Sequence, residues 1–321
     1  MDTPWPALPY AGWRDTLETL HRWTQIVGKI RLALAPTTNH FWSSALFVTP
    51  RGLTTSAMPF GWNTLELELD LTGHELVFRT SADERRTLEL RPCAVADFHD
   101  ELFQTLSELG LALSINERPQ ELLSEALPLA DDRLHFAYDP EQAHRFWRAL
   151  ASSAIVLDEF RARFTGKCSP VQFFWGAFDL AVSRFSGERA PPQPGADAVT
   201  REAYRDEVSS AGFWPGDEIV PMPAFYAYTA PAPSGFDSAP VRPDAASWEP
   251  RRGEFILPYD AVRLSPTPRT MLLEFFQTTY DAGARLAGWD PELERVVPDR
   301  RAALIRRVAR ERPLEGELRV F

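Results

Sequence analysis

The sequence is poor in cysteine and has no long apolar run. Its 321 residues include two cysteines, Cys93 and Cys168, which are too few for a disulfide framework and typical of a reducing compartment. No apolar run approaches the roughly 18 residues that a membrane span needs, and no charged-then-apolar leader precedes the first expected helix. We therefore expect a cytoplasmic protein that is not associated with a membrane.

The sequence also lacks the motifs of several common active sites. It contains no Gly-x-Gly-x-x-Gly, Walker loop, Gly-x-Ser-x-Gly elbow or zinc-ribbon spacing, which argues against dinucleotide, nucleotide and common serine-hydrolase sites. The six histidines are scattered without a His-x-x-x-His pair. A metal site built from Glu18, His21 and His40 is the weaker interpretation, so we expect no metal and no cofactor.

Basic residues are outnumbered by acidic ones. The net charge is −11 and the pI about 5.1, which argues against binding to nucleic acid or to an anionic membrane, because that affinity rests on basic surface. A hydrophobic fraction of 44% with 12% aromatic residues supplies ample core for one large or two ordinary domains. We expect a folded globular protein.

Two stretches of the chain resemble one another, residues 28–56 and 166–187. Each begins with Gly-Lys, passes a proline, reaches Phe-Trp and continues as an apolar stretch towards a glycine. The matched pairs are Gly28-Lys29 with Gly166-Lys167, and Phe41-Trp42 with Phe174-Trp175. We interpret the two stretches as one structural unit used twice.

Lysine is confined to this repeated unit. Among 34 basic residues only Lys29 and Lys167 are lysine, in a composition rich in Arg and Ala that suggests a GC-rich bacterial genome. A compact ammonium differs from a planar guanidinium in reach and hydration, so both positions are candidates for a site that needs an ammonium. The alternative is that each lysine begins a strand and extends its ammonium into solvent.

Periodicity predicts the fold. Helical spacing indicates helices near residues 13–27, 97–109, 139–166 and 267–288, and alternation indicates strands at 65–71, 76–80 and 87–90. A short helix near 199–207 and strands near 173–185 and 224–230 follow in the second half. The prediction is an α+β fold of two pseudo-symmetric halves, each an antiparallel sheet flanked by helices. Its boundaries are residues 1–115, a connector at 116–138, a second half at 139–290 with Pro-rich insertions, and a charged helix or tail at 291–321.

Several long motifs resemble those of a bacterial family, domain of unknown function 5996. The motifs are LHRWTQIVGKIRLALAP, NHFW, RGLTTS, SPVQFFWGAFDLAVSRFSG, EVSSAGFWPG, AFYAY and LPYDAV, and they span roughly residues 5 to 290. The resemblance implies a family but no activity, so it transfers no catalytic role. In the family pattern histidine is common where this chain has Gln172 and Asp206, which implies that neither residue is an indispensable base or metal ligand.

Charged residues inside the second apolar stretch point to a polar site. If residues 173–185 form one strand, Asp179 and Arg184 lie on opposite faces, so each needs its own partner or a polar cavity. Candidate partners are Lys29, Lys167, Glu207 and Tyr226. The alternative is a pair of purely structural ion pairs.

These observations combine into one functional hypothesis. We expect a soluble small-molecule-binding protein or enzyme whose aromatic-lined polar pocket lies between the halves and takes an anionic or polar-aromatic ligand. The candidate ligand-binding residues are Lys29, His40, Trp42, Lys167, Trp175, Asp179, Arg184, Glu207, Trp214 and Tyr226. For an enzyme, Asp179 or Glu207 would be the general acid/base and a lysine the electrophilic stabiliser or the base. The competing hypothesis is a non-catalytic structural or protein-interaction module that uses the Pro-rich loops 188–198 and 230–252.

Overall fold

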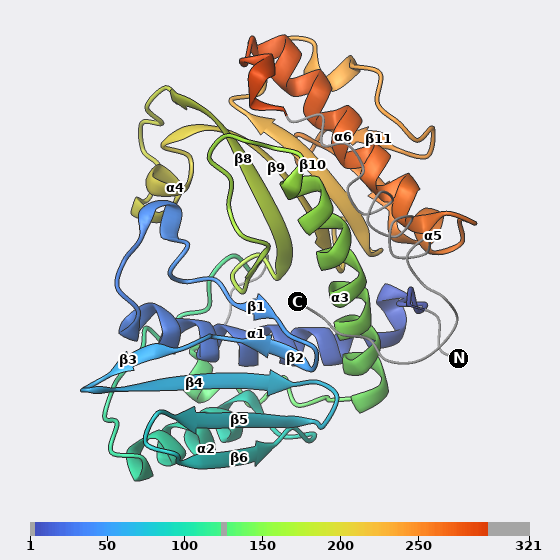
Figure 1. Ribbon diagram of the computed structural model, residues 1–321. Helices are drawn as coiled ribbons and strands as arrows, with labels where there is room; N and C mark the ends of the chain where they lie inside the picture. Colours follow the sequence, from blue (N-terminus) through green and yellow to red (C-terminus); the bar gives the residue numbers. More distant parts are fainter. Residues whose placement is uncertain (1–3, 123–126, 295–321) are drawn as a thin grey trace, which may run out of the picture.

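The computed structural model describes residues 4–122 and 127–294 of the chain and has two antiparallel sheets (Figure 1). The helices are α1 (Tyr10–Leu34), α2 (Val95–Glu108), α3 (Pro140–Ala162), α4 (Ala198–Ala203), α5 (Tyr259–Arg263) and α6 (Pro268–Ala287). Short 3-10 helices are η1 (Asn39–Phe41), η2 (Leu129–Asp131), η3 (Phe236–Ser238) and η4 (Pro291–Leu293). Of the predicted charged helix or tail at 291–321, all but the first four residues lie outside the described part of the chain.

The first sheet occupies the N-terminal half. Its strands are β1 (Phe47–Val48), β2 (Gly52–Thr54), β3 (Met58–Phe60), β4 (Asn63–Asp70), β5 (Glu75–Thr80) and β6 (Arg85–Glu89). They pair in the order β1-β2-β4-β5-β6, with β3 also on β4. The alternating leucines from Leu65 to Leu71 are fully buried, and Glu68 on the opposite face accepts from Arg79 at 2.7 Å. The predicted meander is confirmed.

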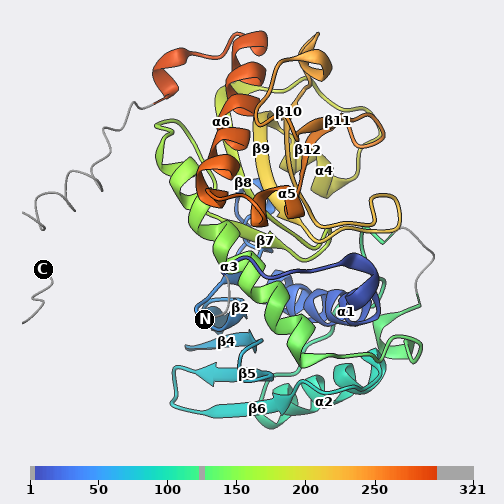
Figure 2. The same ribbon diagram turned by 90° about the vertical axis from the view of Figure 1, so that its right-hand side faces the viewer.

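The second sheet occupies the C-terminal half. Its strands are β7 (Gln172–Phe174), β8 (Asp179–Arg189), β9 (Asp206–Trp214), β10 (Ala224–Ala230), β11 (Ser247–Glu249) and β12 (Glu254–Pro258), in the order β11-β12-β10-β9-β8-β7. α3 and α6 cover one face of this sheet (Figure 2). The opposite face is directed towards α1, the connector and α4. The α+β fold with two antiparallel sheets is therefore confirmed.

Helix α3 links the halves and starts where the sequence predicts. Asp139 is its N-cap, and the side chain accepts from the backbone N–H groups of Glu141 and Gln142, with Pro140 at the first helical position. One face of the helix packs in the core beneath both sheets through Phe146, Leu157 and Phe160. The buried core is contiguous across the two halves.

The prediction that the first helix ends near residue 27 is wrong, and so is the alternative that Lys29 begins a strand. Helix α1 continues past Gly28 to Leu34, and Lys29 lies inside it. Gly28 is therefore not a helix end. It lies inside the helix and allows close packing, since a Cβ there would lie 2.1 Å from Cδ1 of Trp175. The matching Lys167 lies in the segment between α3 and β7. The two Gly-Lys pairs are therefore not equivalent in secondary structure, although the order of helix, sheet and helix does recur.

The single strand predicted over 173–185 is also wrong. β7 and β8 form a hairpin whose turn covers residues 175–178, and Phe178 has a φ of +59°. An apolar sequence without Pro or Asn in the turn gave no sign of it. Asp179 and Arg184 still lie on opposite faces, because both belong to β8.

Candidate functional site

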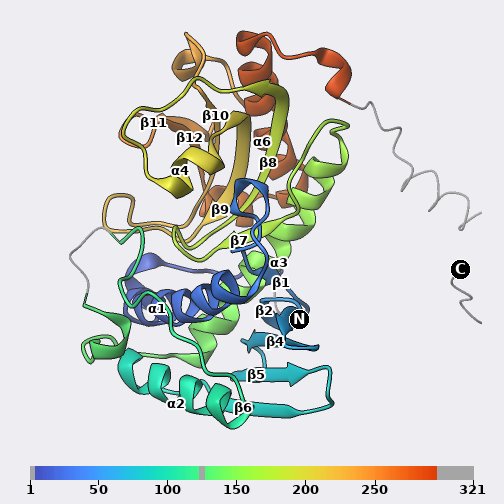
Figure 3. The ribbon, with the colours of Figure 1, turned by 90° about the vertical axis from the view of Figure 1, so that its left-hand side faces the viewer.

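Two neighbouring cavities lie between the halves, over the face of the second sheet that α3 and α6 leave open. They measure about 480 Å³ and about 540 Å³. Helix α1 closes the first cavity, and the segment from η1 with α4 closes the second; Figure 3 shows this segment reaching from α1 to α4. The residues common to both walls are Glu121, Ala177, Asp179, Tyr204, Tyr226 and Tyr228.

Strand alternation places polar side chains on this open face. Tyr226 of β10 pairs with Gly212 of β9, and Tyr228 pairs with Ser210. The glycine is required, because a Cβ at position 212 would lie 2.6 Å from Tyr226 Oη. The Tyr226 ring consequently lies across the strand and reaches Asp179 of β8. Sheet register and one glycine together build the floor of the site.

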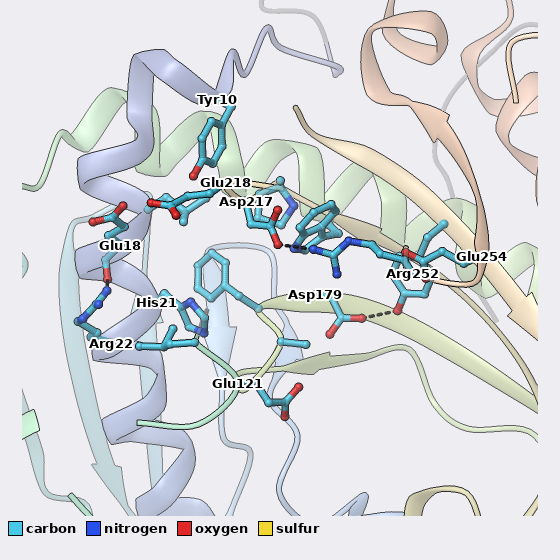
Figure 4. A pocket seen from close by; sticks show the side chains of 18 of the residues that line it. Tyr10, Glu18, His21, Arg22, Glu121, Asp179, Asp217, Glu218, Arg252 and Glu254 are labelled. Carbon is cyan, nitrogen blue, oxygen red and sulfur yellow. Dashed lines mark hydrogen bonds and ion pairs between the residues drawn. The ribbon is translucent and has the colours of Figure 1, made fainter. Parts of the chain in front are cut away.

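Asp179 and Tyr226 form the central polar pair of the site (Figure 4). The tyrosine hydroxyl donates to Oδ2 of the carboxyl group. Asp179 is only 8% exposed, and burial raises its pKa to about 7 even though the hydrogen bond from Tyr226 opposes the shift. At neutral pH this carboxyl group is therefore poised between its two protonation states.

Two further carboxyl groups face the same space. Burial raises the pKa of Glu254 to about 7, with Arg252 opposing and Asp179 adding to the shift. Glu121 as a whole is an exposed residue, but its Oε1 lies over Gly176, where a Cβ would approach it to 2.4 Å. Loss of hydration raises the Glu121 pKa as well. The walls therefore concentrate acidic groups that resist ionisation.

The tyrosines extend the polar network into the second cavity. The hydroxyl groups of Tyr204 and Tyr228 are 3.0 Å apart, and the rings of Tyr226 and Tyr228 stack with centroids 6.1 Å apart. Ser183 donates to Ser210 at 3.2 Å on the same face. A ligand in either cavity would meet hydroxyl groups that can donate as well as accept.

His21 of α1 supports the hairpin turn rather than titrating. Its Nε2–H donates to the carbonyl groups of Trp175 at 3.0 Å and Gly176 at 2.9 Å, and its ring packs 4.7 Å from Phe178. Burial lowers the His21 pKa to about 4, so the imidazole is neutral at physiological pH. Its place beside the first cavity is that of a positioning residue.

A second polar cluster borders the other cavity. His40 donates through Nδ1–H to the carbonyl groups of Glu202 and Ala203, at 3.1 and 3.2 Å, so Nε2 is free to accept from Lys167 Nζ at 2.5 Å. The same ammonium lies 2.8 Å from Asp206 Oδ2. Burial would raise the Asp206 pKa, yet the hydrogen bond and charge of Lys167 bring it below its usual value. Lys167 is thus committed to a structural ion pair.

The ammonium group of Lys29 is also occupied by structural hydrogen bonds. Its Nζ donates to the backbone carbonyl groups of Asn116 at 2.8 Å and Arg118 at 2.7 Å, and so anchors the connector to α1. Neither Lys29 nor Lys167 lines the two cavities. Each ammonium instead lies near the indole supplied by the other half, Lys29 at 5.8 Å from the Trp175 ring and Lys167 at 5.9 Å from the Trp42 ring.

The other candidates divide between the cavities and the core. Those that line a cavity are His40, Trp42, Trp175, Asp179, Trp214 and Tyr226. Arg184 lies on the opposite face of β8, fully buried, with its guanidinium 3.5 Å from the Phe160 ring centroid and donating to the Phe160 carbonyl. Glu207 lines neither cavity.

The sequence interpretation missed Glu121, Tyr204, Tyr228 and Glu254. Tyr228 could have been found, because it alternates with Tyr226 in one strand and must share its face. Glu254 begins β12 and Glu121 lies in the irregular connector, so no period marked either residue. Only the folding of the connector over the second sheet brings Glu121 to the site.

Backbone strain concentrates around the cavities. Seven described residues other than glycine have a positive φ, and four of them, His40, Phe41, Glu121 and Phe178, line a cavity. Such conformations cost energy and persist where the surrounding structure enforces them, commonly at functional sites. Within residues 4–122 and 127–294, no group of three or more His, Cys, Asp or Glu side chains is arranged to hold a metal ion.

Comparisons with known proteins give one match. A family model described as a family of unknown function (DUF5996) matches residues 5–295. No curated protein and no solved structure matches the chain.

Proposed function

We propose a function for this chain, which belongs to the DUF5996 family of unknown function: it binds a small molecule in the paired cavities at the junction of its halves. The observation that carries the proposal is the Asp179–Tyr226 pair, buried in a floor that both cavities share. A buried carboxyl group is costly unless hydrogen bonds or a counter-charge compensate it, and Asp179 has no cationic partner among the described residues. Concave sites with aromatic walls and a few convergent polar groups are the usual form of ligand sites.

The aromatic walls support the same proposal. Trp42, Trp175 and Phe185 face the second cavity, and Trp214 and Phe178 face the first. These rings offer flat apolar surfaces around the polar floor, which suits a ligand with an apolar body and a polar end. Both volumes are within the range of small-molecule sites.

A second candidate is acid–base catalysis on the bound molecule. Asp179 and Glu254 both have a pKa of about 7 and line the first cavity. A general acid or base works best when its pKa lies near the working pH. In this role Asp179 would exchange a proton with the ligand, and Tyr226 would hold the carboxyl group in place.

A location in the bacterial cytoplasm is also part of this proposal. Cys93 and Cys168 are free thiols, which agrees with a bacterial cytoplasm. No helix among the described residues combines the length and apolarity needed to cross a bilayer.

The Pro-rich loop 230–252, the alternative contact surface, directs its large aromatic side chains inward: Phe236 is 1% exposed, and its ring lies 5.9 Å from that of Trp248. This arrangement favours the ligand-binding role over a protein-interaction module.

The proposal is tested with a substitution that fills the space common to both cavities. Ala177 is exposed, lies in the hairpin turn and lines both cavities, so Ala177→Phe should block them without disturbing the core. The purified protein is extracted with solvent, and co-purifying metabolites are identified by mass spectrometry. We expect a compound that is enriched with the wild-type protein and lost with Ala177→Phe, with little change in melting temperature.

The matched control is Ala82→Phe. Ala82 is an exposed turn residue that lines neither cavity, so this variant should retain the compound. The proposal fails if the wild-type protein carries no compound beyond those found with Ala177→Phe.

A further inference from the structure

The walls of the paired cavities carry an imbalance of charge. The first cavity is lined by Glu18, Glu121, Asp179, Asp217, Glu218 and Glu254, against two basic side chains, Arg22 and Arg252, and His135. The second cavity has three acidic residues and, among the described residues, no lysine or arginine in its wall. A nearby cation favours the ionised form of a carboxyl group, so acidic groups that burial keeps partly protonated ionise when a cation enters and attract it, whereas an anion would raise their pKa further.

The two arginines are already engaged. Arg22 lies 3.0 Å from the Asp132 carboxylate and donates to the Glu18 carbonyl. Arg252 pairs with Asp217, and its guanidinium packs 4.1 Å from the Trp214 ring centroid. Neither arginine is left over to neutralise an incoming anion.

The carboxyl groups deeper in the site are not engaged in this way. Asp179 accepts from the Tyr226 hydroxyl group through Oδ2, and its carboxyl group also interacts with its own backbone N–H. Figure 4 shows the second carboxyl oxygen turned from Tyr226 towards the open space beside Glu121. Within the described part of the chain, the side chains of Glu121 and Glu254 form no hydrogen bond or ion pair. The side chain of Asp179 is thus more than nine-tenths buried and has an acceptor directed into the cavity.

Aromatic faces surround these acceptors. The stacked Tyr226 and Tyr228 rings form part of the floor of both cavities, and the Trp175 ring lies at one wall of the second. A ring face attracts a cation through its quadrupole, the more so when water is excluded. Carboxyl groups and ring faces therefore favour the same sign of ligand charge.

We infer that the ligand of this site is a small organic cation, an amine or ammonium group on an apolar body, with its nitrogen against Asp179 and its body against the aromatic walls. The inference rests on the proposed function, because it names the chemical class that the same cavities would take. It replaces the anionic ligand that the lysines suggested, since both lysines are committed elsewhere.

The test uses three probes that share a phenylethyl body and differ in charge: 2-phenylethylamine, 2-phenylethanol and 3-phenylpropionate. Binding to the wild-type protein is measured by isothermal titration calorimetry near neutral pH. We expect the amine to bind about ten-fold or more tightly than the alcohol, and the carboxylate to bind most weakly.

Two aspartate variants link this preference to the site. Asp179→Asn keeps the shape of the side chain and removes its charge, so the affinity for the amine should fall to that for the alcohol. The control Asp83→Asn changes the net charge equally, lies in the β5–β6 turn outside both cavities, and has a φ of +64° that asparagine accepts. It should leave the order of the probes unchanged.

The outcomes separate this inference from the proposed function. Equal or tighter binding of the carboxylate, abolished by Ala177→Phe, would overturn the cationic ligand and leave the binding site standing. If no probe binds the wild-type protein, or if binding is insensitive to Ala177→Phe, the cationic ligand is overturned, whereas the proposed function stands or falls by the co-purification of a compound with the wild-type protein. An amine preference that survives in Asp179→Asn would also overturn the inference, because the charge would then be recognised elsewhere.

Discussion

Asp179 shows how one residue can set the character of a site. It follows a hairpin turn and begins β8 beside the buried residues Leu180 to Val182, and its carboxyl group is buried with a single hydroxyl donor, that of Tyr226. The protein could avoid this cost with an apolar residue of similar size. Because it does not, the cost is most simply explained by a ligand or proton that the carboxyl group meets.

The stability of the protein should reflect this carboxyl group through pH. Its pKa is about 7 in the folded protein and near the ordinary 3.8 when unfolded, so between these values the folded state binds more protons. The free energy of unfolding contributed by Asp179 is therefore full below about pH 4 and is lost as the pH rises through 7. Asparagine does not titrate. We expect Asp179→Asn to gain roughly 2 kcal/mol relative to the wild type between about pH 5 and pH 8.

Urea denaturation of both proteins across this pH range measures the effect. Asp83→Asn is the control, since it removes an exposed carboxyl group and should follow the wild type at every pH. A stability difference between Asp179→Asn and the wild type that does not change with pH would show that Asp179 has an ordinary pKa.

At the scale of the element, helix α1 depends on a glycine in its interior. Gly28 lets the Trp175 indole, which also donates to the Ser44 carbonyl at 2.8 Å, pack directly on the helix backbone. Glycine within a helix normally costs about 1 kcal/mol relative to alanine. The close packing of the two halves outweighs that preference.

Replacing either of two glycines in this helix by alanine should therefore change the free energy of unfolding in opposite directions. Gly28→Ala would place a methyl group into the Trp175 ring and should lower the free energy of unfolding by about 1–3 kcal/mol, the usual cost of overpacking. Gly12→Ala meets only Pro9, at 3.4 Å, and should raise stability by up to about 1 kcal/mol. Urea midpoints of the two variants give the comparison. Equal effects would mean that helix propensity, and not contact with Trp175, determines the result.

At the scale of the whole molecule, the halves share one core. Main-chain hydrogen bonds join Leu46 of the first half to Phe173 of the second in both directions, at 2.9 and 2.8 Å. Lys29 and Lys167 each lie near the tryptophan of the opposite half. Each half therefore contributes main-chain and side-chain contacts to the interface between the two halves.

A shared core predicts that the halves unfold together. We expect one urea transition with the same midpoint by far-ultraviolet circular dichroism and by tryptophan fluorescence, because exposing either sheet would expose the core of the other. Trp175→Ala should shift this common midpoint, with a loss of about 3–5 kcal/mol. Two separate transitions, with only one moved by Trp175→Ala, would contradict a single cooperative unit.

The family could be inferred from long motifs in the chain. The α+β class, the β4–β6 meander and the start of α3 could also be predicted without coordinates, because hydrophobic period and capping chemistry act over a few residues. The sequence also marked Asp179, Tyr226, Trp42, Trp175 and Trp214 as candidates, and these residues line the cavities, since a charge or an indole in an apolar stretch is visible locally. The folded chain was needed to see that α1 runs through Gly28, that the lysines serve as anchors, and that Glu121 and Glu254 lie in the same cavity walls as Asp179. Those outcomes depend on contacts between residues far apart in the chain, and such contacts leave no period in the sequence.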